Sequence, residues 1–225
     1  MNRPARRMKM AVMITMQNSK TMNEFDQKAQ EWDKNKMHLE RTMAVAGMLS
    51  KLIPDKPGLK ALEFGAGTGL LSFYLKDRFS EITLMDSSAE MLKMAEQKME
   101  ADDHLKFKTL FLNLEKEEYH GDPFDIIYSQ MVLHHIKDIN AIIRKFYHLL
   151  TPGGILAIAD LYQEDGSFHD GDIDVHHGFD PEKLIAILRQ HDFQVTAISP
   201  CFVIRKEVSL EREKEYPVFL MTANR

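Results

Sequence analysis

The chain has 225 residues and a mass of 26.0 kDa, and 44% of its residues are hydrophobic, so we expect one α/β domain with a packed core. Its net charge of −5 argues against a nucleic-acid partner, and the lack of any run of about 18 apolar residues argues against a membrane helix or a membrane partner. Cys201 is the single cysteine, which excludes an intramolecular disulfide and a cysteine zinc cluster and suits a reducing cytoplasm, where we expect the protein.

The N-terminal region divides into a tail and a helical cap. Residues 1–20 combine basic residues with a short apolar stretch and no small-residue cleavage site, so we predict a disordered tail. Residues 21–53 are predicted to be helical, with Asn23 as a candidate N-cap. Apolar residues recur here at helical spacing, namely Phe25, Ala29, Trp32, Leu39, Met43, Ala46, Leu49 and Ile53. Proline and glycine at 54–58 end the cap, and 21–225 is predicted to be a single domain.

A glycine-rich turn follows the cap. An apolar strand at 61–64 leads into three glycines, and a helix pattern follows at 70–76. Glycine accepts positive φ angles and lets a ligand approach the backbone, and a helix N-terminus adds unpaired N–H groups. We therefore expect this turn to bind a ligand with polar or anionic groups. The candidate contacts are Gly65, Ala66, Gly67 and Gly69.

Asp86 ends a second apolar run, about 20 residues after the turn, which is the offset of the ribose-binding acid in dinucleotide-type folds. The sequence therefore predicts an adenosine-containing cofactor, with Asp86 and the adjacent Ser87 as candidate contacts. Ser87 and Ser88 are also candidate caps of the next helix. The dinucleotide fingerprint requires a third small residue where this chain has Leu70, which disfavours a nicotinamide cofactor.

The rest of the chain continues to alternate between strands and helices. Strands are predicted at residues 105–113, 124–130 and 155–161, and helices after Ser88, from Asp138 to Leu150 and from Asp180. Residues 194–203 and 217–222 are predicted to form a closing β-hairpin. Its highly charged connection, 205–215, is interpreted as a solvated loop.

Histidines gather in two places. His134 and His135 follow the fourth strand; adjacent residues on a helix point in different directions, so we predict that the pair does not act together and favour a packing role. The loop at 162–179 holds His169, His176 and His177 among five acids. It is open to three interpretations: loop structure, acceptor contact or a metal site. We expect no metal, and the candidate catalytic residues are His134, His176 and His177.

The segment from Glu63 to Gly69 resembles the first motif of the class I S-adenosylmethionine-dependent methyltransferases. Residues 124–136 resemble that family's fourth motif in its Leu-His-His variant, and Pro-Gly-Gly at 152–154 is similar too. The resemblance covers residues 25–222, and the histidine loop is similar to small-molecule enzymes near the ubiquinone and menaquinone biosynthesis group. It implies a Rossmann-like seven-stranded mixed sheet with helices on both faces and an antiparallel last strand.

The resemblance also implies roles for single residues. Glu63 would lie near the cofactor's ammonium group, and Trp32 would cover the cofactor or else only dock the cap. Asn113, followed by Leu114, stands where the family usually has an aspartate that binds adenine; an amide oxygen can accept the same bond. Beside the methionine part of the cofactor the candidates are Ser129, Gln130 and Met131.

The function that we predict is in-line methyl transfer from S-adenosylmethionine to a small-molecule acceptor. Residues 129–132 lack the Pro-Pro-aromatic motif of enzymes that methylate DNA or protein glutamine. Two alternatives remain open, an NAD(P)-dependent oxidoreductase and a non-catalytic S-adenosylmethionine-binding regulatory protein. The acceptor and a homodimeric state are also left open.

Overall fold

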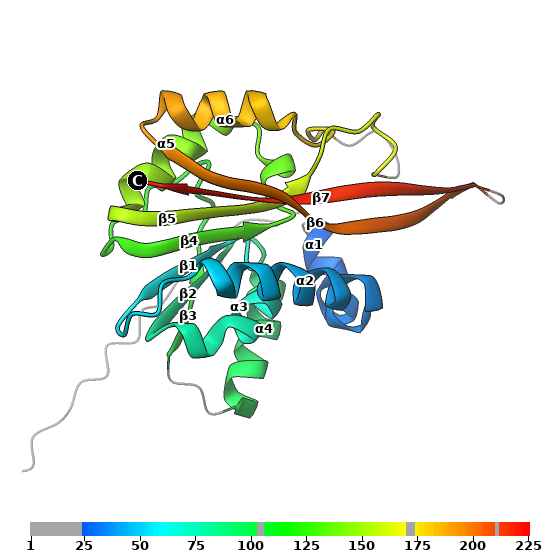
Figure 1. Ribbon diagram of the computed structural model, residues 1–225. Helices are drawn as coiled ribbons and strands as arrows, with labels where there is room; N and C mark the ends of the chain where they lie inside the picture. Colours follow the sequence, from blue (N-terminus) through cyan, green and yellow to red (C-terminus); the bar gives the residue numbers. More distant parts are fainter. Residues whose placement is uncertain (1–23, 103–105, 170–173, 210–211) are drawn as a thin grey trace, which may run out of the picture.

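The computed structural model describes residues 24–102, 106–169, 174–209 and 212–225 (Figure 1). The predicted tail at 1–20 and the candidate cap Asn23 lie outside these residues. Within the described parts of the chain, none of the helices combines the length and apolar character that a membrane-spanning helix needs.

The centre of the molecule is a seven-stranded sheet with the order β3-β2-β1-β4-β5-β7-β6. Its strands are β1 (Lys60–Phe64), β2 (Glu81–Asp86), β3 (Phe107–Phe111), β4 (Phe124–Gln130), β5 (Leu150–Leu161), β6 (Gln194–Ser209) and β7 (Arg212–Asn224). β1 to β5 run parallel, whereas β7 is antiparallel to both β5 and β6. The central strands are buried on both faces, which explains their nearly continuous apolar runs. The predicted mixed sheet with an antiparallel last strand is confirmed.

Helices cover both faces of this sheet (Figure 1). On one face lie α2 (Lys36–Leu52), α3 (Leu70–Leu75) and α4 (Ala89–Asp102), and on the other α5 (Ile139–Leu149) and α6 (Pro181–Gln190). Each face has its own apolar core: Leu49 and Leu71 belong to the first, Phe146 and Leu188 to the second. Asp138 caps α5 by accepting a hydrogen bond from the backbone N–H of Ala141.

The helical cap is broken into α1 (Glu24–Lys28), the 3-10 helix η1 (Ala29–Lys34) and α2. The break comes at Asn35, whose side chain accepts hydrogen bonds from the N–H groups of Met37 and His38 and so caps α2. Asp33 joins the cap to the domain: it accepts a 2.6 Å hydrogen bond from the Thr68 hydroxyl and lies 2.7 Å from Lys98 Nζ. The cap is therefore fixed directly over the glycine-rich turn.

The predicted loop at 205–215 is wrong. β6 continues to Ser209 and β7 begins at Arg212, so the charged segment is a two-stranded ribbon that extends beyond the rest of the sheet (Figure 1). Arg205 pairs with Glu215 across the ribbon, with Nε 3.0 Å from Oε1. A ribbon that meets water on much of its surface carries few apolar residues, so the alternation that predicts a strand is missing.

Two strand boundaries also differ from the prediction. β3 ends at Phe111 because Asn113 begins a turn, in which its Oδ1 accepts a hydrogen bond from the Glu115 N–H. β5 begins at Leu150, which pairs with Phe124 of β4 ahead of an irregularity in the register. Both boundaries depend on partners distant in sequence or on turn chemistry.

Candidate active site

One cavity of about 1330 Å³ lies where the carboxyl ends of the parallel strands meet the helical cap and the start of the ribbon. In open α/β sheets this is the usual place for a ligand. Of the cofactor-binding and catalytic candidates chosen from the sequence, the cavity is lined by Trp32, Glu63, Gly65, Ala66, Gly67, Asp86, Ser87, Asn113, Leu114, Gln130, Met131 and His134. Gly69, Ser129, His176 and His177 are not among its lining residues.

The glycine-rich turn forms the floor of this cavity. Gly65, Gly67 and Gly69 have φ angles of 65°, 54° and 74°, a region that favours glycine. A Cβ at Gly65 would lie 2.5 Å from the Val132 side chain, so packing also requires a glycine there. At Gly67 the nearest atom, Met91 Sδ, would be 3.8 Å from a Cβ, which would stand in the cavity. The turn thus leaves room for a ligand beside its backbone.

Asp86 closes the turn onto the end of β2. Its Oδ2 accepts a 2.7 Å hydrogen bond from the Gly67 N–H, and its Oδ1 accepts one of 2.8 Å from the Ser88 N–H. Burial raises the pKa of Asp86, while these two N–H groups lower it. The cap of α4 is Ser88, whose Oγ accepts from the Met91 N–H, and Ser87 lines the cavity.

Glu63 lies at the inner end of β1 and is only 3% exposed. Its Oε2 accepts hydrogen bonds from the Ser72 hydroxyl and, at 3.2 Å, from the Ser72 N–H. Ser72 Oγ lies 2.6 Å from the Tyr128 hydroxyl, which completes a buried chain that the sequence did not reveal. Burial raises the pKa of Glu63 to about 8, so its carboxyl group is mostly protonated at neutral pH.

Aromatic side chains of the cap form one wall. Phe25 and Trp32 have ring centroids 6.2 Å apart in an edge contact, and both line the cavity. Phe25 also meets His135 at 5.2 Å, and Trp32 lies 4.3 Å from the His38 ring. The cap thus extends along the cavity from the glycine-rich turn to His135.

At the far end of the cavity, Gln130 donates a 2.8 Å hydrogen bond from Nε2 to the Thr42 hydroxyl. Met131 has a φ angle of 58°, and Ser129 is buried within β4.

Arg41 of α2, which the sequence did not indicate, lines the same end of the cavity although it is only 4% exposed. Burial lowers its pKa to about 10, and its Nη1 lies 3.7 Å from Met37 Sδ. Its Nε has no hydrogen-bond partner among the described residues.

The expectation that His134 and His135 point in different directions is wrong. Both lie in the 3-10 turn η3 (Leu133–His135), which brings their ring centroids to 4.1 Å. His169 joins them from the loop after β5, with its centroid 5.2 Å from each. Burial lowers the pKa of His135 to about 3, and the neighbouring histidines act in the same direction. A tight turn and a long-range contact, neither visible in the sequence, build this cluster.

His134 is held by Asp160 of β5. Its Nδ1 lies 2.6 Å from Asp160 Oδ1, and its backbone N–H donates to Oδ2 at 3.3 Å. Burial alone would raise the pKa of Asp160, but the charge and hydrogen bonds of His134 bring it below its usual range. In its neutral form, His134 would donate its Nδ1 proton to Asp160 and leave its Nε2 as an acceptor.

The other two candidate histidines lie elsewhere. His176 Nε2 is 2.9 Å from the Ile136 carbonyl oxygen, and its backbone N–H donates to the His134 carbonyl. His177 is exposed, with its ring against Gly166. The structure thus places His176 as a brace of the loop and brings His135 and His169, rather than His176 and His177, to the cavity beside His134.

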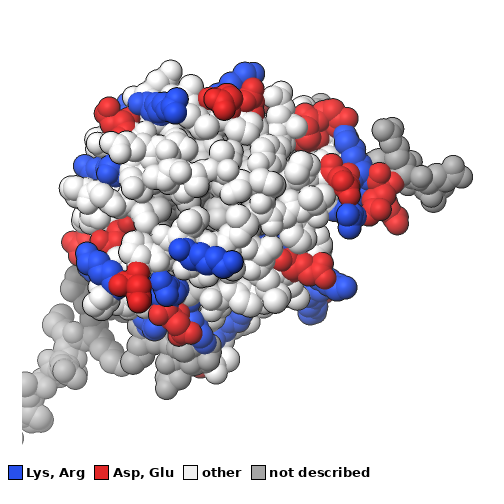
Figure 2. All heavy atoms as spheres, in the orientation of Figure 1, with Lys and Arg blue, Asp and Glu red and all other residues white. Residues whose placement is uncertain are grey.

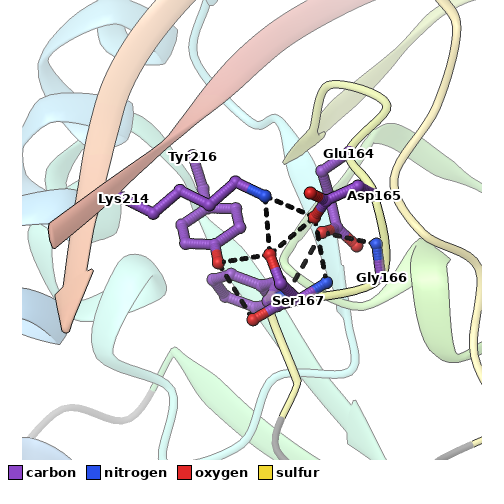
Figure 3. A network of polar contacts seen from close by, with 7 residues as sticks. Glu164, Asp165, Gly166, Ser167, Lys214 and Tyr216 are labelled. Atoms are coloured by element: carbon purple, nitrogen blue, oxygen red, sulfur yellow. Dashed lines mark hydrogen bonds and ion pairs between the residues drawn. The ribbon is translucent and has the colours of Figure 1, made fainter. Parts of the chain in front are cut away.

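The ribbon holds the loop that carries His169. Lys214 donates a 2.6 Å hydrogen bond to the Ser167 hydroxyl and forms an ion pair with Asp165 (Figure 3). Tyr216 donates a 2.9 Å hydrogen bond to the Ser167 carbonyl oxygen. Glu164 accepts hydrogen bonds from the N–H groups of Gly166 and Phe168. The segment that the sequence suggested was a solvated loop therefore positions part of the site.

On the face shown in Figure 2, most lysine and arginine side chains lie beside aspartate and glutamate around a largely uncharged centre. The ion pairs among the described residues include Lys34 with Glu31 and Lys93 with Glu90. This face therefore shows no extended basic surface among the described residues.

Known proteins share this architecture. Residues 62–156 match a family model described as "Methyltransferase domain". Over 125 residues the chain is 36% identical to phosphoethanolamine N-methyltransferase 3 of Arabidopsis thaliana, in an alignment that covers 54% of this chain and 24% of that protein. The chain spans about half or less of the length of the curated relatives it matches.

Two solved structures share the fold at low sequence identity. A methyltransferase in complex with the Haloferax volcanii Trm112 activator superposes with a TM-score of 0.73 at 17% identity, covering 91% of this chain and 99% of that one. Magnesium protoporphyrin IX methyltransferase of Synechocystis, solved with bound S-adenosylmethionine, gives a TM-score of 0.63 at 17% identity, covering 92% and 86%. The glycine-rich turn, the strand order and the matched segment agree: residues 62–156 are similar to the methyltransferase domain family, and the chain has the fold of solved S-adenosylmethionine-dependent methyltransferases.

Proposed function

We propose that this chain transfers the methyl group of S-adenosylmethionine to a small-molecule acceptor bound in the same cavity. The observation that carries the proposal is the continuity of the 1330 Å³ cavity, which runs from the glycine-rich turn and Asp86 to the wall formed by Gln130 and His134. Ligand pockets usually measure roughly 300–1,000 Å³. This cavity therefore has room for a cofactor and an acceptor side by side.

We propose that S-adenosylmethionine binds at the end of the cavity nearest the glycine-rich turn, where several polar and apolar side chains line the wall. Asp86 would bind the ribose hydroxyls, and Ser87 lies next to it. Leu114 and the Asn113 amide would contact the adenine, and Trp32 would cover the bound molecule. Glu63 faces the inner end, where an ammonium group would draw the proton from its carboxyl group.

The acceptor end is where we place the small molecule. Gln130 and Met131 line this end, with the imidazole of His134 beside them. Arg41 adds a buried positive charge whose Nε is without a partner among the described residues. The Asp160 carboxylate stabilises this charge electrostatically, but the Nε–H itself lacks a partner, so we propose that a negatively charged group of the acceptor completes this contact.

Catalysis here depends mainly on position. The bound cofactor supplies a methyl group already activated by the sulfonium. The chain holds the acceptor's nucleophilic atom in line with that methyl group, and Phe25 and Trp32 help to exclude water. His134, fixed by Asp160, presents an Nε2 that can accept a proton if the acceptor carries one.

The test has two stages. S-adenosylhomocysteine should raise the melting temperature and NAD should not, because a ligand that binds the native state stabilises it. The protein is then incubated with methyl-labelled S-adenosylmethionine and fractionated metabolite extracts, with Asp86→Ala as the control. We expect the wild type, but not Asp86→Ala, to transfer the labelled methyl group to a small anionic compound. Cofactor binding without transfer to any fraction would support the regulatory alternative instead.

A further inference from the structure

We propose that His134, His135 and His169 bind one divalent metal ion of borderline softness, with Zn²⁺ as the best match, at the acceptor end of the cavity. One ring nitrogen from each histidine lies within 4.8 Å of those of the other two. The sequence had suggested no metal, and the loop considered there combined His169 with His176 and His177. In the structure, His169 lies beside His134 and His135 of η3 rather than beside His176 and His177.

The spacing of the rings fits a metal centre. Zn²⁺ binds imidazole nitrogen at about 2.0–2.1 Å, so the ion lies about 3.2 Å from the ring centre, and two rings at a tetrahedral angle have centres about 5.2 Å apart. His169 lies at a centroid distance of 5.2 Å from both His134 and His135. The 4.1 Å between His134 and His135 is about 1.1 Å short of that separation, so metal binding requires this pair of rings to open.

Asp160 supplies the outer contact typical of such sites. Metal-binding histidines usually give their second ring N–H to a carboxylate, which fixes the tautomer and makes the ligating nitrogen more basic. His134 Nδ1 lies 2.6 Å from the fully buried Asp160 carboxylate, so its Nε2 is the nitrogen left for an ion. Asp160 also places a negative charge beside a centre that would gain two positive charges.

The segments that carry His134 and His169 are anchored by contacts of their own. The His134 backbone is fixed to Asp160 Oδ2, and the loop before His169 is anchored to the ribbon through Ser167, Lys214 and Tyr216 (Figure 3). All three histidines line the cavity. Three protein ligands and an open side are the arrangement of catalytic rather than structural zinc sites. If the proposed function holds, an ion there would bind an oxygen or nitrogen of the acceptor and lower its proton affinity.

The experiment measures metal binding directly and does not depend on an acceptor. Tag-free full-length protein is stripped with a chelator and dialysed, and Zn²⁺ is titrated by calorimetry, with metal content measured by mass spectrometry. Co²⁺ is added in parallel for its visible absorption spectrum. We expect one ion per chain and a Co²⁺ spectrum typical of four-coordinate nitrogen ligation.

Variants separate this site from adventitious binding. His169→Ala and His135→Ala should abolish stoichiometric binding, and Asp160→Asn should weaken it roughly 10–100-fold. His177→Ala is the matched control, because its exposed ring does not line the cavity. S-adenosylhomocysteine binding by each variant confirms folding.

Two results would overturn the proposal: no stoichiometric ion in the wild type, or equal loss of binding in His177→Ala. The first result would leave the histidines as a metal-free cluster around a proton-accepting Nε2. Failure of the proposed function would look different, since the ion would bind while no acceptor became labelled.

Discussion

The backbone N–H of Gly67 lies 2.7 Å from Oδ2 of Asp86, so the glycine-rich turn after β1 is joined directly to the end of β2. Sequence places these residues 19 positions apart, and the parallel pairing of β1 with β2 brings them together. The contact makes one carboxylate responsible for both the shape of the turn and the proposed ribose site.

Asp86→Ala should therefore lower the affinity for S-adenosylhomocysteine at least about tenfold, because hydrogen bonds to a charged group contribute roughly 1.5–3 kcal/mol. Calorimetry measures the change. Asp77→Ala, which removes an exposed carboxylate from the 3-10 helix η2 (Lys76–Arg78), is the control and should bind normally. Unchanged affinity in a folded Asp86→Ala protein would show that the ribose is held elsewhere.

Glu63 should give the empty protein a distinctive dependence of stability on pH. Its folded pKa of about 8 lies above the ordinary value of 4.5, so the native state retains a proton that the unfolded chain loses. The stability from this group is fully present below pH 4.5 and falls as pH rises towards 8. Denaturant unfolding of wild type and Glu63→Gln across this range should show the difference, and parallel curves would contradict it.

Trp32 offers a direct optical signal, since it is the single tryptophan of the chain and lines the cavity. If it covers the cofactor, S-adenosylhomocysteine should change its fluorescence in a saturable way, with the dissociation constant found by calorimetry. Trp32→Phe should keep most of the affinity, whereas Trp32→Ala should weaken binding because the apolar cover is lost. Binding that leaves the fluorescence unchanged would mean that Trp32 only docks the cap.

Arg41 should show opposite effects on stability and activity. Arg41→Met removes a buried charge whose Nε has no partner among the described residues, so the melting temperature of the empty protein should rise. The same change should reduce kcat/KM for an anionic acceptor at least about tenfold and leave cofactor affinity intact. A lower melting temperature with unchanged turnover would show that Arg41 serves the fold alone.

Much of the cofactor end could be predicted from the sequence because its signals are local. The alternation of apolar runs predicted the strands and helices, and three closely spaced glycines before a helix predicted the turn. Asp86 followed from its position at the end of the next strand. These features depend on backbone conformation and periodicity, which a short stretch of residues expresses directly.

The acceptor end was decided by the tertiary structure. Arg41 gives no signal in the sequence, because a charged residue in an amphipathic helix is usually solvated, and only the packing of α2 buries it. The ribbon at 205–215 lacks apolar alternation, so its pairing and its hold on Ser167 appear only when β6 and β7 meet.

The histidines show the same division most clearly. The sequence determined that five histidines lie near the carboxyl ends of β4 and β5, and the tertiary structure decided which of them meet. The 3-10 turn η3 places the rings of His134 and His135 side by side, and the loop anchored to the ribbon adds His169. His176 instead contacts the Ile136 carbonyl oxygen. Side chains on a loop are placed by contacts distant in sequence, and such contacts leave no periodic trace along the chain.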